Sequence, residues 1–205
     1  MQIYSKKDIL KVAKILESGG IIAFPTETVF GLGVLSNSKE NFLKLVKVKN
    51  RNPDKPFTLM ISKIEQVKDL VEIDAKTEKI IKKFMPGPLT LVLKKKNNIE
   101  IPSYFDLNSG YIGIRIPDDK FILSLIDLVD CPLLVPSANK SNEKPAKNVD
   151  EIIKIFENEI DCVVNGECGS GVPSTVAKID KENVIILREG IIKKEDLEDV
   201  KWLLH

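Results

Sequence analysis

Four clusters of polar and charged residues carry the side chains in this sequence that could do chemistry. They occupy residues 25–33, 49–55, 135–142 and 169–176, and each follows or interrupts an apolar run typical of a buried strand. Loops at strand ends are the usual place for a site on an α/β scaffold, because the rigid sheet holds them in position. The four clusters are therefore candidate parts of a functional site.

The first cluster crowds two hydroxyls and a carboxylate after an apolar run. Thr26, Glu27 and Thr28 follow residues 21–24, and two glycines come next. Glycines suit a backbone that must turn or pass close to another group. The same residue types also cap ordinary turns, so this cluster alone favours neither interpretation.

The second cluster is cationic. Lys49, Arg51 and Lys55 converge after a predicted helix, in a segment that Pro53 keeps extended. The guanidinium fork of arginine matches phosphate or carboxylate oxygens, and lysine adds point charge. Most charge runs are solvated surface, which is the favoured interpretation of this cluster when it is taken alone.

The remaining clusters mix hydroxyls, amides and glycines. Ser137 and Asn139 lie two residues apart and would point to the same side of an extended chain, although polar loops often contain both types. Residues 169–175 combine glycines with hydroxyls, which can form a nest of backbone N–H groups for an anion. Neither G-x-x-x-x-G-K-[S/T] nor G-x-G-x-x-G occurs, so a nucleotide site here would have another design.

The sequence excludes several kinds of catalytic site. Its only histidine is His205, so a Ser-His-Asp or Cys-His mechanism and a histidine metal site are excluded. The cysteines at 131, 162 and 168 lack a zinc-binding spacing and are expected to be small apolar residues in a reducing compartment.

The charge balance and the apolar content of the sequence limit the kinds of partner that the protein can bind. Lys and Arg total 31 against 30 Asp and Glu, a formal net charge of +1. Proteins that act on duplex nucleic acid need a strongly basic face, so this balance argues against nucleic-acid binding as the main function. The sequence has neither an apolar signal core nor an apolar run near the roughly 18 residues of a membrane span. We expect a cytoplasmic protein with no membrane partner.

Hydrophobic periodicity and turn residues predict alternating helices and strands. Helices are predicted at residues 6–18, 64–71, 75–84, 118–129, 149–156 and 193–204, and another is capped by residues 36–38. Strands are predicted at residues 21–24, 57–61, 89–94, 111–116, 132–135, 161–164, 175–179 and 184–187, with a hairpin turn at 180–183. The pattern predicts an α/β fold, a mixed sheet flanked by helices in one domain over residues 1–205.

Taken together and in order, the motifs resemble the YrdC family, the threonylcarbamoyl-AMP synthases. The matching motifs are PTETVFGLG at 25–33, the K-x-R of Lys49 and Arg51, PGPLT at 86–90, GIRIP at 113–117, PSAN at 136–139, GVPSTV at 171–176, and Arg188 with Gly190. Each motif is weak alone, but the ordered set is specific and spans nearly the whole chain. The chain resembles the short, single-domain form of the family.

The resemblance implies a twisted mixed sheet with a concave, basic cavity. The family's polar tetrad would be Lys49, Arg51, Ser137 and Asn139, with Lys49 and Arg51 in the catalytic role. Threonine or its carbamate would contact Thr28, Arg115, Ser137 and Ser174. ATP would lie along Arg51, Lys55, Asn139 and Arg188, and no residue is assigned to a metal. Met60 stands where several relatives carry a histidine.

The implied reaction joins L-threonine, bicarbonate and ATP into threonylcarbamoyl-adenylate and pyrophosphate, with Mg²⁺ accompanying the ATP. The product would pass to a tRNA threonylcarbamoyltransferase, and contact between this chain and RNA would be weak.

Two alternatives stay open. One is an RNA-binding or ribosome-maturation module with a basic cavity, which the 6% aromatic content disfavours because few rings can stack on bases. The other is a carbamoyl-transfer enzyme that uses carbamoyl phosphate, which the lack of zinc-finger and acylphosphatase-like segments disfavours.

Overall fold

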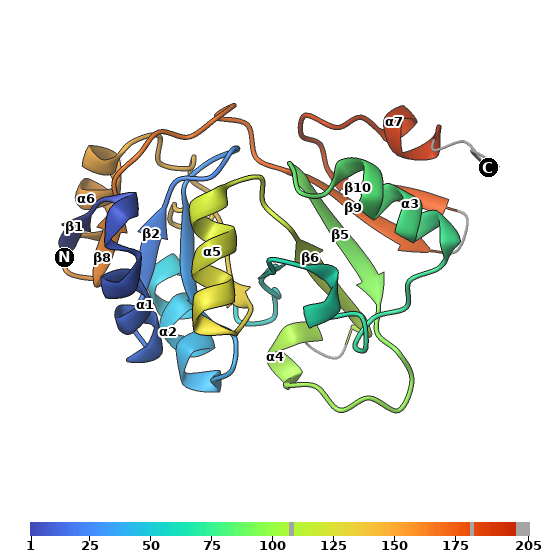
Figure 1. Ribbon diagram of the computed structural model, residues 1–205, viewed down its shortest axis with the longest axis horizontal. Coiled ribbons are helices and arrows are strands. Elements are labelled where there is room, and N and C mark those ends of the chain that lie inside the picture. Colours follow the sequence, from blue (N-terminus) through green and yellow to red (C-terminus); the bar gives the residue numbers. More distant parts are fainter. Residues whose placement is uncertain (107–108, 181–182, 200–205) are drawn as a thin grey trace.

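The computed structural model describes residues 1–106, 109–180 and 183–199, which form a mixed sheet with helices on both faces (Figure 1). The strands are β1 (Gln2–Tyr4), β2 (Ile22–Phe24), β3 (Gly31–Leu35), β4 (Leu59–Met60), β5 (Leu89–Lys94), β6 (Tyr111–Arg115), β7 (Leu133–Leu134), β8 (Cys162–Val164), β9 (Thr175–Asp180) and β10 (Asn183–Arg188). The helices are α1 (Ile9–Glu17), α2 (Lys39–Lys49), α3 (Ala75–Phe84), α4 (Ser103–Asp106), α5 (Lys120–Val129), α6 (Val149–Phe156) and α7 (Lys194–Glu198), with 3₁₀ turns at Lys6–Asp8 and Ile64–Gln66.

The strands lie in the order β1-β8-β2-β3-β7-β4-β6-β5-β9-β10. Parallel pairs join β1 to β8, β8 to β2, β4 to β6 and β5 to β9. The other neighbours pair antiparallel. The predicted α/β fold with a mixed sheet is therefore confirmed.

The sheet separates two hydrophobic clusters. Neighbouring residues of one strand point to opposite faces, so Leu59 joins the larger cluster and Met60 the smaller one. Helices α2, α3, α4, α6 and α7 contribute to the larger cluster, and α1 and α5 to the smaller. Within the described chain, every helix is too short or too polar to cross a bilayer.

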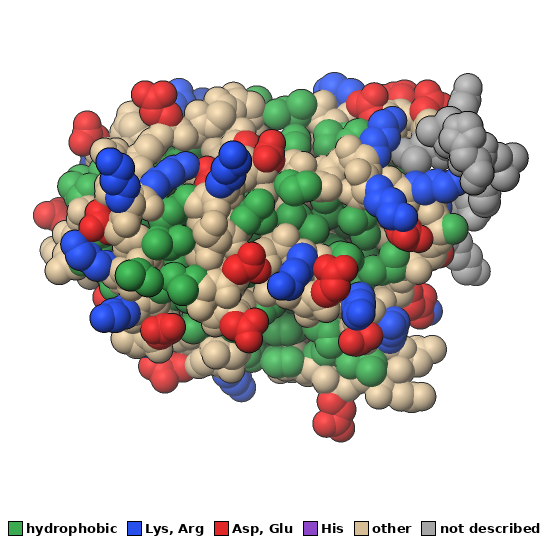
Figure 2. Space-filling model, in the orientation of Figure 1, with side chains coloured by type: hydrophobic (Ala, Val, Ile, Leu, Met, Phe, Trp, Pro, Cys, Tyr) green, Lys and Arg blue, Asp and Glu red, His purple; other side chains and the backbone are tan. Residues whose placement is uncertain are grey.

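Helices cover the two halves of the sheet unequally. Every residue of β2, β3 and β8 is buried, whereas β5, β6 and β9 bury mainly alternate residues. The buried apolar residues of β5, β6 and β9 belong to the larger cluster, so their neighbours along each strand point to the face on which α1 and α5 pack. That face is therefore only half covered. On the side shown in Figure 2, acidic and basic side chains are interspersed.

Several boundaries differ from the prediction. The helix predicted at 64–71 is only a 3₁₀ turn, because Val71 bridges to Lys95 and the Glu72 amide donates to Lys94, extending the β5 ladder. The predicted helix at 193–204 is observed as Lys194–Glu198, and residues 200–204 lie outside the described residues. Residues 181–182 of the predicted hairpin turn also lie outside them, although β9 and β10 pair antiparallel.

The glycines of the first cluster lie in a strand, β3, where the backbone passes close to neighbouring side chains, one of the two roles expected for them. A Cβ on Gly33 would lie 2.7 Å from the Phe24 ring, and one on Gly31 would lie 2.8 Å from Val135 Cγ1. Phe24 is fully buried on the neighbouring strand. Glycine is therefore needed here so that an aromatic ring can lie against the sheet.

Replacing Gly33 with Ala should lower the free energy of unfolding by about 1–3 kcal/mol, because the added methyl overpacks the core against Phe24. The matched control is Gly113→Ala on β6, where the nearest atoms are 3.9 Å from the added Cβ and stability should hold or rise. Urea denaturation measures both. Equal stability of the two variants would contradict the packing constraint.

Candidate active site

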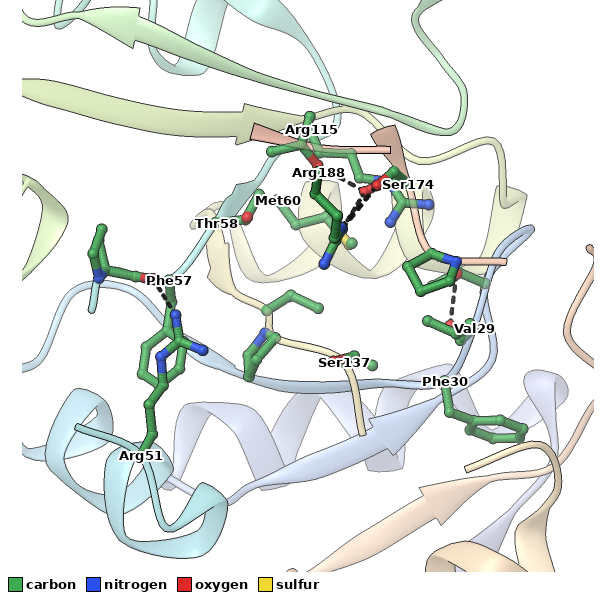
Figure 3. Close-up of a pocket in the computed structure, with 17 residues that line it drawn as sticks. Val29, Phe30, Arg51, Phe57, Thr58, Met60, Arg115, Ser137, Ser174 and Arg188 are labelled. Carbon is green, nitrogen blue, oxygen red and sulfur yellow. Dashed lines mark hydrogen bonds between the residues drawn. The ribbon is translucent and has the colours of Figure 1, made fainter. Parts of the chain in front are cut away.

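A cavity opens on the half-covered face of the sheet (Figure 3). It is concave, and its wall combines apolar side chains with a few polar and charged groups, as small-molecule sites do. Its charged lining residues are Arg51, Arg115 and Arg188, and its hydroxyl residues are Thr26, Thr58, Thr90, Ser137 and Ser174. Three guanidiniums and no lining carboxylate make this cavity suited to an anionic ligand.

Arg115 is held by the loop that follows β2. Its Nη2 donates to Glu27 Oε1 at 2.8 Å and to Thr28 Oγ1 at 2.9 Å. Thr26 Oγ1 donates to the Val29 carbonyl, so the bond between the two threonine hydroxyls must run from Thr28 to Thr26. The Thr28 oxygen therefore presents its lone pair to Arg115, which orients the guanidinium.

Arg188 reaches the same wall of the cavity from β10. Its Nε and Nη2 donate to the Ser174 carbonyl at 3.1 and 2.9 Å, and Nη2 also donates to Ser174 Oγ. Ser174 Oγ lies 2.9 Å from Thr90 Oγ1. Arg188 is an exposed residue overall, but partial desolvation of its charged group, together with the charge of Arg115, lowers the pKa of Arg188.

Arg51 occupies the opposite side of the cavity, where Figure 3 shows it against the Phe57 ring. The guanidinium lies 5.0 Å from the ring centroid, and its Nε and Nη2 donate to the carbonyls of Lys55 and Pro56. Partial burial lowers the pKa of Arg51. These neutral acceptors orient the guanidinium without cancelling its charge.

Lys49 is buried beneath the cavity, not on its wall. The side chain is 2% exposed, and Nζ donates to the Ser137 carbonyl at 2.6 Å and to the carbonyl and Oδ1 of Asn139. Ser137 Oγ also donates to Asn139 Oδ1, and Asn139 Nδ2 donates to the carbonyls of Lys140 and Glu143. Lys49 thus fixes the loop that brings Ser137 to the cavity.

Two opposing effects act on the charge of Lys49. Burial, with repulsion from Arg51 and Lys140, lowers the pKa of Lys49 to about 7. The oxygen acceptors around Nζ favour the ammonium form. The amine is therefore held in place by its hydrogen bonds, and it loses its proton far more easily than an exposed lysine does.

Two of the polar clusters are joined by their main chains. The amides of residues 169, 170 and 171 donate in turn to the carbonyls of residues 26, 27 and 28. A Cβ on Gly169 would lie 2.2 Å from the Glu27 carbonyl oxygen, so only glycine permits this approach. The two loops therefore form one continuous wall, which leads to Ser174.

The structure brings the predicted site residues into one region, but not all of them onto the cavity surface. Those that line it are Arg51, Arg115, Ser137, Ser174 and Arg188. Those that do not are Thr28, Lys49, Lys55 and Asn139. Thr28, Lys49 and Asn139 are buried and bonded to the lining residues or their loops, and Lys55 is exposed and contributes its carbonyl. The ligand contacts assigned to these four residues stay predictions.

Sequence reasoning assigned no ligand contact to several residues of the cavity wall, among them Thr58, Met60 and Thr90. A signal existed for Thr90, because Leu89 and Leu91 point to the core and strand alternation sends the residue between them to the other face. Met60 was noted only as a departure from relatives. It packs in the smaller hydrophobic cluster and gives the cavity an apolar patch.

Comparisons with known proteins find related proteins over most of the length of this chain. The Sua5/YciO/YrdC family model, described as telomere recombination, matches residues 14–190. The chain is 33% identical over 190 residues to the threonylcarbamoyl-AMP synthase of Pyrococcus abyssi, covering 92% of this chain and 55% of that protein. A Methanocaldococcus jannaschii relative is 34% identical, covering 94% of this chain and 90% of its own.

A solved structure shares the fold over almost the whole chain. The crystal structure of P. abyssi Sua5 in complex with L-threonine has a TM-score of 0.90 at 31% identity and covers 98% of this chain and 61% of that one. The chain thus spans little more than half the length of the Pyrococcus protein.

The role of Lys49 in fixing the loop can be tested by stability. Lys49→Met should lower the free energy of unfolding by about 1–3 kcal/mol, because the Ser137 and Asn139 carbonyls lose their buried donor. Lys47→Met, on the exposed side of the same helix, should change it by less than about 0.5 kcal/mol. Urea denaturation that gives the same value for both variants would contradict this role.

Proposed function

The chain belongs to the Sua5/YciO/YrdC family, and we propose that it is a threonylcarbamoyl-AMP synthase. The proposed reaction joins L-threonine, bicarbonate and ATP into threonylcarbamoyl-adenylate, with release of pyrophosphate and water. The observation that carries this proposal is the cavity lined by three arginines and five hydroxyl residues. The similarity to synthases favours this activity over the RNA-binding alternative.

The two sides of the cavity suit the two anionic substrates. Arg51 stands on one side, and Arg115 and Arg188 stand with Ser174 on the other (Figure 3). In this proposal the phosphates of ATP lie between Arg51 and Arg188, with Lys55 and Asn139 along the nucleotide. Threonine and its carbamate lie against Arg115, Ser137 and Ser174, with Thr28 behind them.

The chemistry proceeds by alignment and charge neutralisation. The threonine amine and bicarbonate form a carbamate with loss of water. A carbamate oxygen then attacks the α-phosphorus of ATP, and the bond from that phosphorus to the bridging oxygen breaks as pyrophosphate leaves. Arg51 and Arg188 would stabilise the charge that grows on the leaving group, as donors already oriented before reaction do. Lys49 would fix the loop that carries Ser137 and, in its charged form, would add positive potential beneath the cavity.

Mg²⁺ would enter as part of the ATP substrate. Among the described residues, no group of three or more His, Cys, Asp or Glu could hold a metal, and no carboxylate lines the cavity. The oxygen ligands that Mg²⁺ prefers would then come from the phosphates and water. The ion would supply charge neutralisation for the phosphates.

The product is a reactive mixed anhydride, so a second enzyme must consume it. We propose that a tRNA threonylcarbamoyltransferase takes it up in the cytoplasm for threonylcarbamoyladenosine formation. The near-neutral charge of this chain supports a small-molecule hand-over in which the chain itself has only weak contact with RNA.

Pyrophosphate release should require threonine and bicarbonate together, because the nucleophile is assembled from both. An enzyme-coupled pyrophosphate assay, with each substrate omitted in turn, tests this requirement. Labelled bicarbonate should place its carbon in the adenylate product. Equal ATP turnover without threonine or without bicarbonate would refute the proposed reaction.

Ser174→Ala should raise the KM for threonine roughly ten- to a hundredfold, the effect of losing a hydrogen bond to a charged group, and should change the KM for ATP far less. The control is Ser170→Ala in the same loop, because the Ser170 side chain is exposed and bonds only to Val172. It should leave both constants unchanged. Parallel effects of Ser174→Ala on both substrates would show that Ser174 has been assigned to the wrong ligand.

A further inference from the structure

Arg115 and Glu27 form an incomplete ion pair behind the cavity wall. The pair makes one hydrogen bond, between Arg115 Nη2 and Glu27 Oε1. Arg115 Nε and Glu27 Oε2 are both buried without a partner. Arginine and carboxylate often form two parallel bonds, so an arrangement that leaves both atoms unpaired requires an explanation.

The protein acceptors around Arg115 converge on one nitrogen. Glu27 Oε1 and Thr28 Oγ1 take the two protons of Nη2. Within the described residues, no acceptor is bonded to the N–H groups at Nε and Nη1. Nε is fully buried, but Nη1 is not among the buried unpaired atoms, so an oxygen atom of a ligand in the cavity is the acceptor that could satisfy Nη1.

Glu27 cannot move easily to complete the pair itself. Its carbonyl accepts from the Ser170 amide at 2.9 Å, and the residues on either side are bonded to the same loop. Gly169 lies so close to the Glu27 carbonyl that no side chain fits between them. The main chain that carries the Glu27 carboxylate is therefore fixed relative to the neighbouring loop.

Glu27 also sets the charge of this wall. The charge of Arg115 acts on Arg188, so the two guanidiniums repel each other. Glu27 is bonded to Arg115 but does not line the cavity. The countercharge therefore lies behind the arginine, which leaves the positive edge of the guanidinium toward the ligand.

We propose that Glu27 is a positioning residue for the amino-acid substrate. It holds Nη2 of Arg115 from behind, so that the guanidinium turns Nη1 toward the carboxylate of the bound amino acid. This role rests on the proposed function, because it requires an amino acid at the Arg115 side of the cavity. It gives the carboxylate in the first sequence cluster a task distinct from capping a turn.

Isothermal titration calorimetry with L-threonine, and separately with a non-hydrolysable ATP analogue, tests the proposal without relying on turnover. Glu27→Gln keeps the size of the side chain and removes its charge. It should raise the Kd for L-threonine by about tenfold or more, because the charge-assisted hydrogen bond that holds Arg115 toward the amino acid is weakened. It should leave the Kd for the ATP analogue unchanged, because in this proposal Arg115 orients only the amino acid. Glu72→Gln is the matched control, since it removes an exposed ion pair with Lys94 and should change neither Kd.

The outcomes separate this inference from the proposed function. A wild-type protein that binds no L-threonine would refute the proposed substrate. Wild-type binding with unchanged affinity in Glu27→Gln would overturn the positioning role alone. A loss of both affinities with a lower melting temperature would make Glu27 a structural residue and would also overturn it.

A second variant covers the case in which Glu27→Gln does not fold. Glu27→Asp keeps the charge but is one methylene too short to reach Arg115 as Glu27 does. It should weaken L-threonine binding selectively, and wild-type affinity in this folded variant would overturn the proposal.

Discussion

The unequal covering of the sheet is the constraint on which the rest of this structure depends. Helices pack along one whole face, but α1 and α5 cover only half of the other. A strand with one uncovered face must place polar or small residues there, because exposed apolar surface is costly. Thr58, Thr90 and Arg115 occupy such positions at the edge of the covered half. The cavity is thus a direct result of where helical packing stops.

The crowding of positive charge in this cavity is stabilised mainly by neutral acceptors. Arg51 and Arg188 donate to main-chain carbonyls, which orient the guanidiniums and leave their charge intact. Only Arg115 has a carboxylate partner, and that partner lies behind it. Desolvation lowers the pKa of Arg51 and of Arg188, and at Arg188 the nearby charge of Arg115 lowers it further. Such an arrangement costs stability in the empty protein and favours an anionic ligand.

The sequence motifs are structural units as much as contact surfaces. The loop at 169–171 is bonded through its amides to the loop at 26–28, and Lys49 fixes the loop that carries Ser137. Residues of a motif that do not reach the cavity, such as Asn139, hold those that do. A family signature can therefore be retained for the shape of the wall as well as for the ligand it faces.

Local patterning was sufficient for most elements and for the family. Helices α3 and α6 and strand β5 have the predicted bounds, because caps and hydrophobic periodicity act over a few residues.

The sequence pattern could not show which residues are buried or which residues they bond to, because both depend on contacts between distant segments. Lys47 and Lys49 are alike in sequence, yet one is exposed and the other lies beneath the cavity. The same holds for the glycines of β3, which are explained by packing against Phe24 and Val135. Tertiary structure alone decided which residues of each motif line the cavity, because that depends on which face of the sheet the helices leave open.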